Sequence, residues 1–108
     1  MRIKISDDAE RDMESGVRFY EKQAPGVGEY FLDTIHAEID SLILYAGIHR
    51  IVHGMHRLLI QRFPFAIYYE IHEEVVYLWA VFDCRSDPKK MRRKIKKRVV
   101  TVGKKTGR

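Results

Sequence analysis

The chain has 108 residues, of which 45% are hydrophobic and 32% are charged, a balance that predicts one folded domain and excludes a disordered chain. Its net charge is +5, yet residues 1–84 carry 8 Lys/Arg and 14 Asp/Glu, whereas residues 85–108 carry 12 Lys/Arg and one acid, Asp87. A basic end on an acidic body predicts contact with a polyanion or an acidic partner protein, unless it is a solvated tail.

The N-terminal half predicts a short strand followed by two helices. Residues 2–5 alternate polar and apolar side chains, as a strand does. Ser6 is suited to cap a helix from about Asp7 to Lys22, because acidic residues fill its first turn. After a turn at residues 25–28, a second amphipathic helix fades near Ala46. The short link predicts an antiparallel helical hairpin.

Three strands are predicted next, at residues 57–63, 66–72 and 75–82, and residues 47–55 before them are predicted to form a loop. The short links predict an antiparallel meander with a tight turn at residues 73–74. The last run is almost entirely apolar, so we expect it to be the central strand, covered on both faces. The helical hairpin is expected to cover one face of this sheet.

The C-terminal end predicts a third helix. Asp87 followed by Pro88 is typical of a helix start. Met91, Ile95 and Val99 then recur at helical spacing among lysines and arginines, which predicts a basic amphipathic helix whose apolar side docks on something. Residues 103–108 are expected to be loose. The predicted fold is therefore α+β, with a domain at residues 1–90 and a basic extension at residues 91–108.

Location and metal content are constrained by the same composition. No run approaches the ~20 apolar residues that span a bilayer. No apolar segment with a small-residue cleavage site follows Met1, so we expect a cytoplasmic protein without membrane contact. Cys84 is the only cysteine, which excludes an intrachain disulfide and a four-thiolate metal site. No cysteine-enzyme signature surrounds it, so we interpret it as a small residue at a strand end.

Histidines and arginines are the candidates for chemistry. Three histidines have a spacing that suits zinc on a helix, but two glycines predict a loop there, so no metal site is expected: His49, His53 and His56. Arg57, Arg62 and Arg85, flanked by His56 and Lys89, are expected to gather at one sheet edge and bind phosphate. Nearby aromatics would stack on bases or, as is commoner in a meander, form core: Phe63, Phe65, Tyr68 and Tyr69.

Several segments together resemble the RelE/ParE family of toxins from bacterial type II toxin–antitoxin, or plasmid stabilisation, modules. They are residues 19–28, 52–54, 57–69 and 81–88, within a likeness that runs from Ile3 to about Met91. The most specific are Arg62-Phe63-Pro64-Phe65 and the Arg85-x-Asp87-Pro88 ending. The resemblance implies a helical hairpin on a small, mainly antiparallel sheet, and a cognate antitoxin whose C-terminal segment wraps the toxin and blocks it. We expect no cofactor.

The family has two branches, one that cuts messenger RNA on the ribosome and one, ParE-like, that poisons DNA gyrase. The RNA-cutting branch has an arginine where this chain has Ala66, and a tyrosine where it has Lys89, while its second arginine is matched by Arg85. We therefore expect a ParE-like gyrase inhibitor, without catalytic machinery of its own. The alternatives are a ribosome-dependent mRNA endonuclease, with Arg62, Arg85 and His56 as candidate catalytic residues, and a non-toxic nucleic-acid-binding module.

Residues expected to contact the target or nucleic acid are cations from the strands and from the basic helix: Arg57, Arg62, Arg85, Lys89, Lys90, Arg92 and Arg93. Guanidinium and ammonium groups suit phosphate contact. The extension after Met91 lies beyond the family core, so we expect it to tune partner or target binding rather than to carry the toxic activity.

Overall fold

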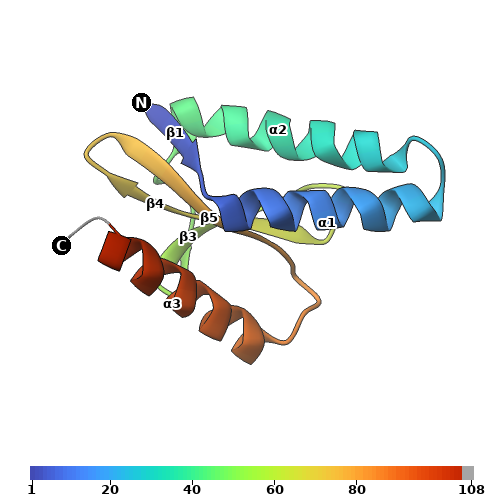
Figure 1. Cartoon of the computed structure of the whole chain (residues 1–108). Coiled ribbons are helices and arrows are strands. Elements are labelled where there is room, and N and C mark those ends of the chain that lie inside the picture. Colours follow the sequence, from blue (N-terminus) through green and yellow to red (C-terminus); the bar gives the residue numbers. More distant parts are fainter. Residues whose placement is uncertain (106–108) are drawn as a thin grey trace.

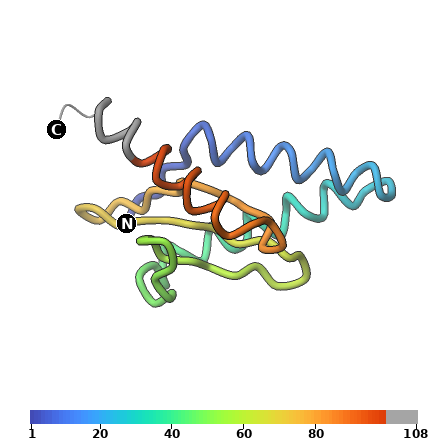
Figure 2. Tube along the Cα trace, turned by 90° about the horizontal axis from the view of Figure 1, so that it is seen from below, coloured from blue at the N-terminus to red at the C-terminus, as the bar shows by residue number. Residues whose placement is uncertain are grey.

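The computed structural model describes residues 1–105, with side chains described for residues 1–99. The elements follow the order β1 (Arg2–Ile5), α1 (Asp7–Gln23), α2 (Val27–Tyr45), β2 (Ile51–Val52), β3 (Met55–Leu59), β4 (Phe65–His72), β5 (Val75–Asp83) and α3 (Pro88–Lys105). The α1–α2 hairpin covers one face of the sheet and α3 lies against the other (Figure 1). Figure 2 shows the same layers from the α3 side. The predicted α+β fold with a helical hairpin and a basic C-terminal helix is confirmed.

Local capping signals place the helix ends. The Ser6 side chain accepts a hydrogen bond from the backbone N–H of Ala9 at 3.0 Å, which satisfies one of the unpaired donors at the start of α1. The turn into α2 is held by Glu21, whose carboxylate accepts hydrogen bonds from the backbone N–H groups of Gly26 and Gly28. These bonds set the short connection that makes α1 and α2 antiparallel neighbours.

The sheet has the strand order β1-β5-β4-β3-β2. Strands β3, β4 and β5 form the predicted antiparallel meander, and the predicted tight turn at Glu73 and Glu74 has both residues at positive φ. Strand β1 pairs in parallel with β5. The prediction that the third run is the central strand is wrong, because β4 occupies the middle of the order, although β5 is covered on both faces as expected.

Two apolar clusters lie on the two faces of the sheet. Under the hairpin, side chains of α1 and α2 such as Met13, Phe31 and Ile35 pack on β4 and β5. Under α3, Met91 and Ile95 pack with buried side chains of the other face: Met55, Ala66, Tyr68, Trp79, Ala80 and Phe82. The apolar stripe predicted for the third helix therefore docks on the chain's own sheet.

Three boundaries differ from the sequence prediction. The strand expected at residues 57–63 covers Met55–Leu59, because the chain bends at Arg62, which has a φ of 74°. The expected loop at residues 47–55 contains β2, which pairs with β3 in a hairpin. Helix α3 continues to Lys105, beyond Gly103, where a loose tail was expected. The rest of that expected tail, residues 106–108, lies outside the described residues.

Candidate functional site

Arg85 lies two residues after the end of β5, on the exposed connection to α3. Its guanidinium contacts both carboxylate oxygens of Asp83, with Nη2–Oδ2 at 2.7 Å and Nε–Oδ1 at 3.0 Å. The hydrogen bonds from Arg85 lower the pKa of the Asp83 carboxyl. The arginine side chain remains 63% exposed, so one edge of the guanidinium is held by the protein while much of the group faces solvent.

Arg62 lies in the bend between β3 and β4. Its Nη1 donates a hydrogen bond of 2.7 Å to the Tyr30 hydroxyl at the start of α2. Arg62 itself is exposed, like Arg85. Both connections lie toward the end of the molecule where α1 turns into α2 (Figure 1).

A cluster of aromatic rings joins these two arginines. Phe63 packs against Tyr20 and Tyr30, with ring centroids 4.9 and 5.3 Å apart. The charge of Arg85 acts on Tyr20, whose pKa is raised mainly by burial. Tyr30 is 42% exposed, and Phe19, whose ring lies 5.0 Å from that of Tyr20, is 50% exposed. We call this exposed part of the molecule the arginine–aromatic end, and define it by Arg62, Arg85, Phe19 and Tyr30.

The four aromatic residues that the sequence analysis considered for base stacking lie in the core. Phe63, Phe65, Tyr68 and Tyr69 are all buried, as the more common meander pattern predicts. Their faces are occupied by other side chains of the protein. They therefore give the sheet its stability rather than a surface for ligands.

Arg57 lies apart from Arg62 and Arg85. It pairs across the sheet with Tyr68 and points to the α3 face, and its buried Nε has no hydrogen-bond partner among the described residues. Burial raises the pKa of Tyr68, and the charge of Arg57 offsets part of that rise. Burial likewise raises the pKa of the Cys84 thiol. A raised pKa disfavours the thiolate, which is the form in which a cysteine acts as a nucleophile.

His56 points to the opposite face from Arg57. Its ring stacks on Tyr69 at 5.0 Å, and its Nδ1 lies 2.7 Å from the backbone carbonyl of His49. The Tyr69 hydroxyl accepts a hydrogen bond from Gly47 N–H and also contacts the His49 ring. His49 and His56 therefore hold the connection from α2 to β2 in place. His56 does not lie with Arg62 and Arg85, as the sequence analysis had expected. Among the described residues, no group of three or more His, Cys, Asp or Glu side chains is placed to hold a metal ion.

The four predicted contact residues of the basic helix are exposed on the outside of α3: Lys89, Lys90, Arg92 and Arg93. Asp87 starts this helix, with its carboxylate accepting a hydrogen bond of 2.9 Å from Lys89 N–H. Because Met91 and Ile95 are buried against the sheet, the cations of α3 are held outward.

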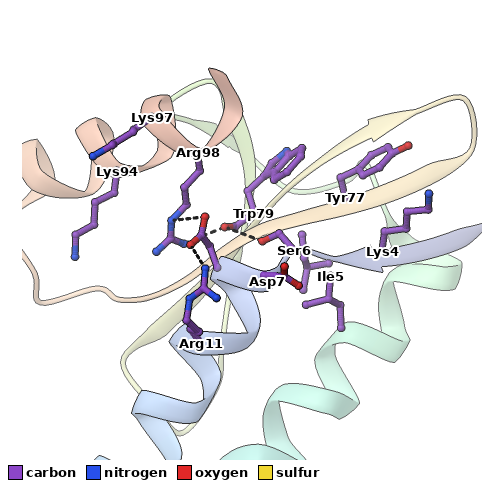
Figure 3. A pocket seen from close by; sticks show the side chains of 12 residues that line it. Lys4, Ile5, Ser6, Asp7, Arg11, Tyr77, Trp79, Lys94, Lys97 and Arg98 are labelled. Atoms are coloured by element: carbon purple, nitrogen blue, oxygen red, sulfur yellow. Dashed lines mark hydrogen bonds and ion pairs between the residues drawn. The ribbon is translucent and has the colours of Figure 1, made fainter. Parts of the chain in front are cut away.

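A groove separates α3 from β1 and the start of α1 (Figure 3). It has a volume of about 640 Å³. Lys94, Lys97 and Arg98 of α3 line it, as do Lys4 of β1, Arg11 of α1, and Tyr77 and Trp79 of β5. The Lys94 and Lys97 side chains point away from Lys4 (Figure 3). Sequence reasoning missed this groove, because β1 and α3 are distant in the sequence.

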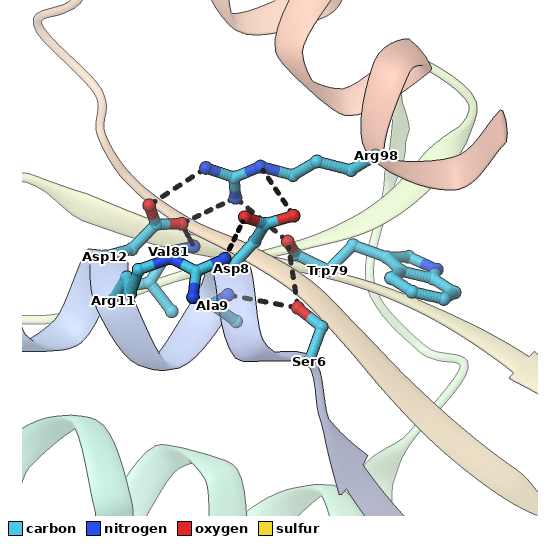
Figure 4. A network of polar contacts seen from close by, with 8 residues as sticks. All are labelled: Ser6, Asp8, Ala9, Arg11, Asp12, Trp79, Val81 and Arg98. Atoms are coloured by element: carbon cyan, nitrogen blue, oxygen red, sulfur yellow. Dashed lines mark hydrogen bonds and ion pairs between the residues drawn. The ribbon is translucent and has the colours of Figure 1, made fainter. Parts of the chain in front are cut away.

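Arg98 does not serve as an exposed cation. Its guanidinium pairs with Asp12 of α1, with Nη1–Oδ2 at 2.7 Å and Nη2–Oδ1 at 3.0 Å, and both side chains are 15% exposed (Figure 4). It also donates to the carbonyl oxygen of Trp79, while Asp12 accepts from Val81 N–H. These bonds satisfy backbone groups at a β-bulge, because Tyr68 pairs with Ala80 and Tyr69 with Leu78. Little in the sequence indicates this role, because Arg98 differs from the other cations of α3 only in lying next to Val99, the last residue of the apolar stripe.

No helix within the described residues has both the length and the apolar character needed to cross a membrane.

Residues 3–88 match the family described as the ParE toxin of the type II toxin–antitoxin system parDE. Among solved structures, one titled "Chromosomal ParDE TA system from P. aeruginosa" is similar, with a TM-score of 0.71 and 19% sequence identity. The similarity covers 77% of this chain and 95% of that chain. Because the sequence identity is only 19%, it shows a shared fold. No curated protein sequence matches the chain significantly.

Proposed function

Because this chain belongs to the ParE toxin family of type II toxin–antitoxin systems, we propose that it inhibits DNA gyrase and that a cognate antitoxin neutralises it. Growth arrest would then follow from protein–protein contact with gyrase rather than from chemistry on a bound substrate. The toxin would need an exposed and rigid contact surface, which the arginine–aromatic end supplies.

One observation carries the choice of gyrase over messenger RNA. The position that holds an arginine in RNA-cutting relatives is Ala66 here, and this residue is fully buried in one cluster with Met91 and Ile95 of α3. A substrate phosphate cannot reach that face while α3 covers it. His56, the candidate base, lies on the other face with one ring nitrogen bound to a backbone carbonyl. General acid–base catalysis requires such groups to converge on one reacting atom.

The arginine–aromatic end supports target contact by its composition. Arg62 and Arg85 are exposed but oriented by Tyr30 and Asp83, so they lose little conformational entropy on binding. Arginine and exposed aromatic rings are enriched at the centres of protein interfaces. We assign the target contact to this end, and the outer cations of α3 to an auxiliary electrostatic role.

A second surface supports binding of an antitoxin. Four large apolar side chains at the end of α2 and in the loop after it are more than half exposed: Ile43, Leu44, Tyr45 and Ile48. Soluble proteins rarely leave such a patch without a partner. Leu44→Asp and Ile48→Asp should each weaken co-purification with the protein encoded by the adjacent gene, whereas Asp40→Ala, at an exposed position of the same helix, should not.

The gyrase assignment is tested with purified bacterial gyrase. The chain should block supercoiling of relaxed plasmid and raise the amount of cleaved DNA. Arg62→Ala combined with Arg85→Ala should remove inhibition while leaving the circular dichroism spectrum and antitoxin binding intact, and Lys22→Ala serves as the control. Unimpaired supercoiling with a large excess of the chain would exclude gyrase as the target. Codon-phased cuts in messenger RNA on translating ribosomes would establish the endonuclease instead.

A further inference from the structure

The outer side of α3 carries a row of exposed cations, which we call the basic ridge. Met91 and Ile95 are buried against the sheet, so the opposite side of the helix faces away from the protein. None of the described elements covers that side (Figures 1 and 2). The basic ridge consists of five exposed side chains: Lys89, Lys90, Arg92, Arg93 and Lys96.

The cations of the basic ridge have no ion-pair partner among the described residues. Cations elsewhere in the chain are paired: Asp12 holds Arg98 at 2.7 Å. Asp83 holds Arg85 at the same distance. Asp87 is the only acid after residue 84, and its carboxylate already accepts the hydrogen bond that starts α3. The positive charge of the basic ridge is therefore left for a ligand to neutralise.

The positions of these cations do not stabilise the helix itself. Lys89 and Lys90 lie in the first turn of α3, which contains no acidic residue. The positive end of the helix dipole disfavours cations there. Ridge cations are also four residues apart, at positions 89 and 93 and at positions 92 and 96, where like charges repel each other. An anion that contacts these side chains would relieve both kinds of repulsion.

The surroundings of the basic ridge favour a nucleic acid duplex over other polyanions. Protein interfaces and membrane-bound helices both depend on apolar side chains that become buried, and the apolar side of α3 is already packed on its own sheet. Residues 88–99 contain no aromatic side chain on which the bases of a single strand would stack. The major groove of B-DNA admits an α-helix, whereas that of duplex RNA is too narrow to do so.

The basic ridge also matches duplex DNA in length and charge. Lys89 and Lys96 lie about 10 Å apart along the helix axis, given the α-helical rise per residue. Duplex DNA presents roughly six phosphates over such a length. Residues 1–84 have a net charge of −6 (8 − 14) and residues 85–108 one of +11 (12 − 1), so the charge distribution directs DNA toward the α3 side. We propose that the basic ridge binds the phosphates of duplex DNA, independently of base sequence.

This inference goes beyond the proposed inhibition of gyrase, and its tests contain no gyrase, so either proposal can fail while the other stands. Binding is measured by fluorescence anisotropy of the purified full chain with a labelled 20-base-pair DNA duplex. The logarithm of the affinity should fall linearly with the logarithm of salt concentration, by about 0.9 per phosphate contacted. An unlabelled duplex of unrelated sequence should compete equally. Stronger competition by a DNA single strand, an RNA duplex or polyglutamate of the same charge would overturn the proposal.

Matched charge variants separate the basic ridge from net charge. The ridge variant neutralises three cations of α3: Lys89→Gln, Arg93→Gln and Lys96→Gln. The control neutralises three exposed cations elsewhere in the chain: Arg18→Gln, Lys22→Gln and Arg50→Gln. The ridge variant should bind the duplex about tenfold more weakly or worse, with a salt slope shallower by about 2 to 3, while the control keeps its slope. Equal losses of affinity and slope in the two variants would overturn the assignment to α3.

Thermal unfolding distinguishes a lost contact with DNA from a damaged fold. Without DNA, the ridge variant should melt at a temperature no lower than that of the wild type, because it loses repulsive pairs. Saturating DNA duplex should raise the melting temperature of the wild type and leave that of the ridge variant nearly unchanged. A lower melting temperature for the free ridge variant, or an equal rise with DNA in both proteins, would contradict the proposed role of these cations.

Discussion

Arg98 of α3 and Asp12 of α1 form a two-armed ion pair across the edge of β5, between elements on opposite faces of the sheet. Each partner also binds a backbone group of β5: Arg98 the carbonyl of Trp79, and Asp12 the N–H of Val81. The pair therefore fastens α3 to the sheet at the bulge where ladder pairing is irregular.

Removing one partner of this pair should destabilise the protein strongly. Arg98→Met leaves the Asp12 carboxylate largely buried without its counter-charge, which should lower the free energy of unfolding by about 3 kcal/mol. Asp12→Ala should cost more, because the Val81 N–H then loses its acceptor as well. Urea unfolding followed by circular dichroism measures both. Arg11→Gln, in an exposed pair, is the control, and an equal effect there would refute the special role of Arg98.

The apolar side of α3 should matter for stability as much as a core helix does. Ile95 is 3% exposed, so Ile95→Ala should cost about 3 kcal/mol through lost burial and the cavity left behind. Lys96→Ala, on the exposed side of the same turn, should stay within about 0.5 kcal/mol of the wild type. Thermal unfolding compares the two. If Ile95→Ala were neutral, α3 would not be packed on the sheet in solution.

Close contact between α1 and α2 depends on Gly16. A Cβ at this position would lie 2.5 Å from Cε2 of Phe31, which is fully buried and cannot move aside freely. Gly16→Ala should therefore destabilise the protein by about 1–3 kcal/mol, outweighing the helix propensity gained by alanine. Ser15→Ala, at the exposed neighbouring position, is the control. A higher melting temperature for Gly16→Ala would show that the hairpin tolerates a wider separation.

Stability should fall on mild acidification because of His49. Burial, reinforced by the charge of His56 and opposed by Glu38, lowers the pKa of His49 in the folded state. Below the unfolded-state pKa of about 6.5, the unfolded chain takes up a proton that the folded chain does not, so stability is lost as pH falls through this range. Unfolding free energies at pH 7.5 and 5.5 should differ more for the wild type than for His49→Gln. Parallel changes would assign the pH dependence to other groups.

Sequence reasoning succeeded where the determinants are local. Ser6 and Asp87 cap their helices through bonds to residues two or three positions away, and the Glu73–Glu74 turn joins two strands directly. Such signals lie within a few residues, so they can be read without knowledge of the fold. The hairpin, the meander and the basic helix followed from them.

The features that the sequence analysis predicted wrongly depend on contacts between residues that are distant in the sequence. Ile60 and Phe63 continue an apolar pattern, but the chain bends between them so that both reach the core beneath the hairpin. The pattern of Met91 and Ile95 is the same whether a helix docks on a partner or on its own sheet, and only the need to cover Tyr68 and Phe82 decides between these outcomes. For the same reason Arg98 was indistinguishable from the exposed cations beside it.

The parallel pairing of β1 with β5 has a consequence for synthesis on the ribosome. The residues of β1 have no strand to pair with until Val75 and the residues after it have emerged from the ribosome. Asp12 has no ion-pair partner until Arg98, 86 residues later, has been synthesised. At elongation rates of about 5–20 residues per second this delay is roughly 4–17 s. The apolar faces of α1 and α2 stay uncovered and accessible to chaperones until β4 and β5, on which they pack, have been synthesised. The N-terminal strand and helix therefore reach their final packing only after β5 and α3 have been synthesised, and a chain released before β5 would lack both the sheet partner of β1 and the helix that covers the second apolar cluster.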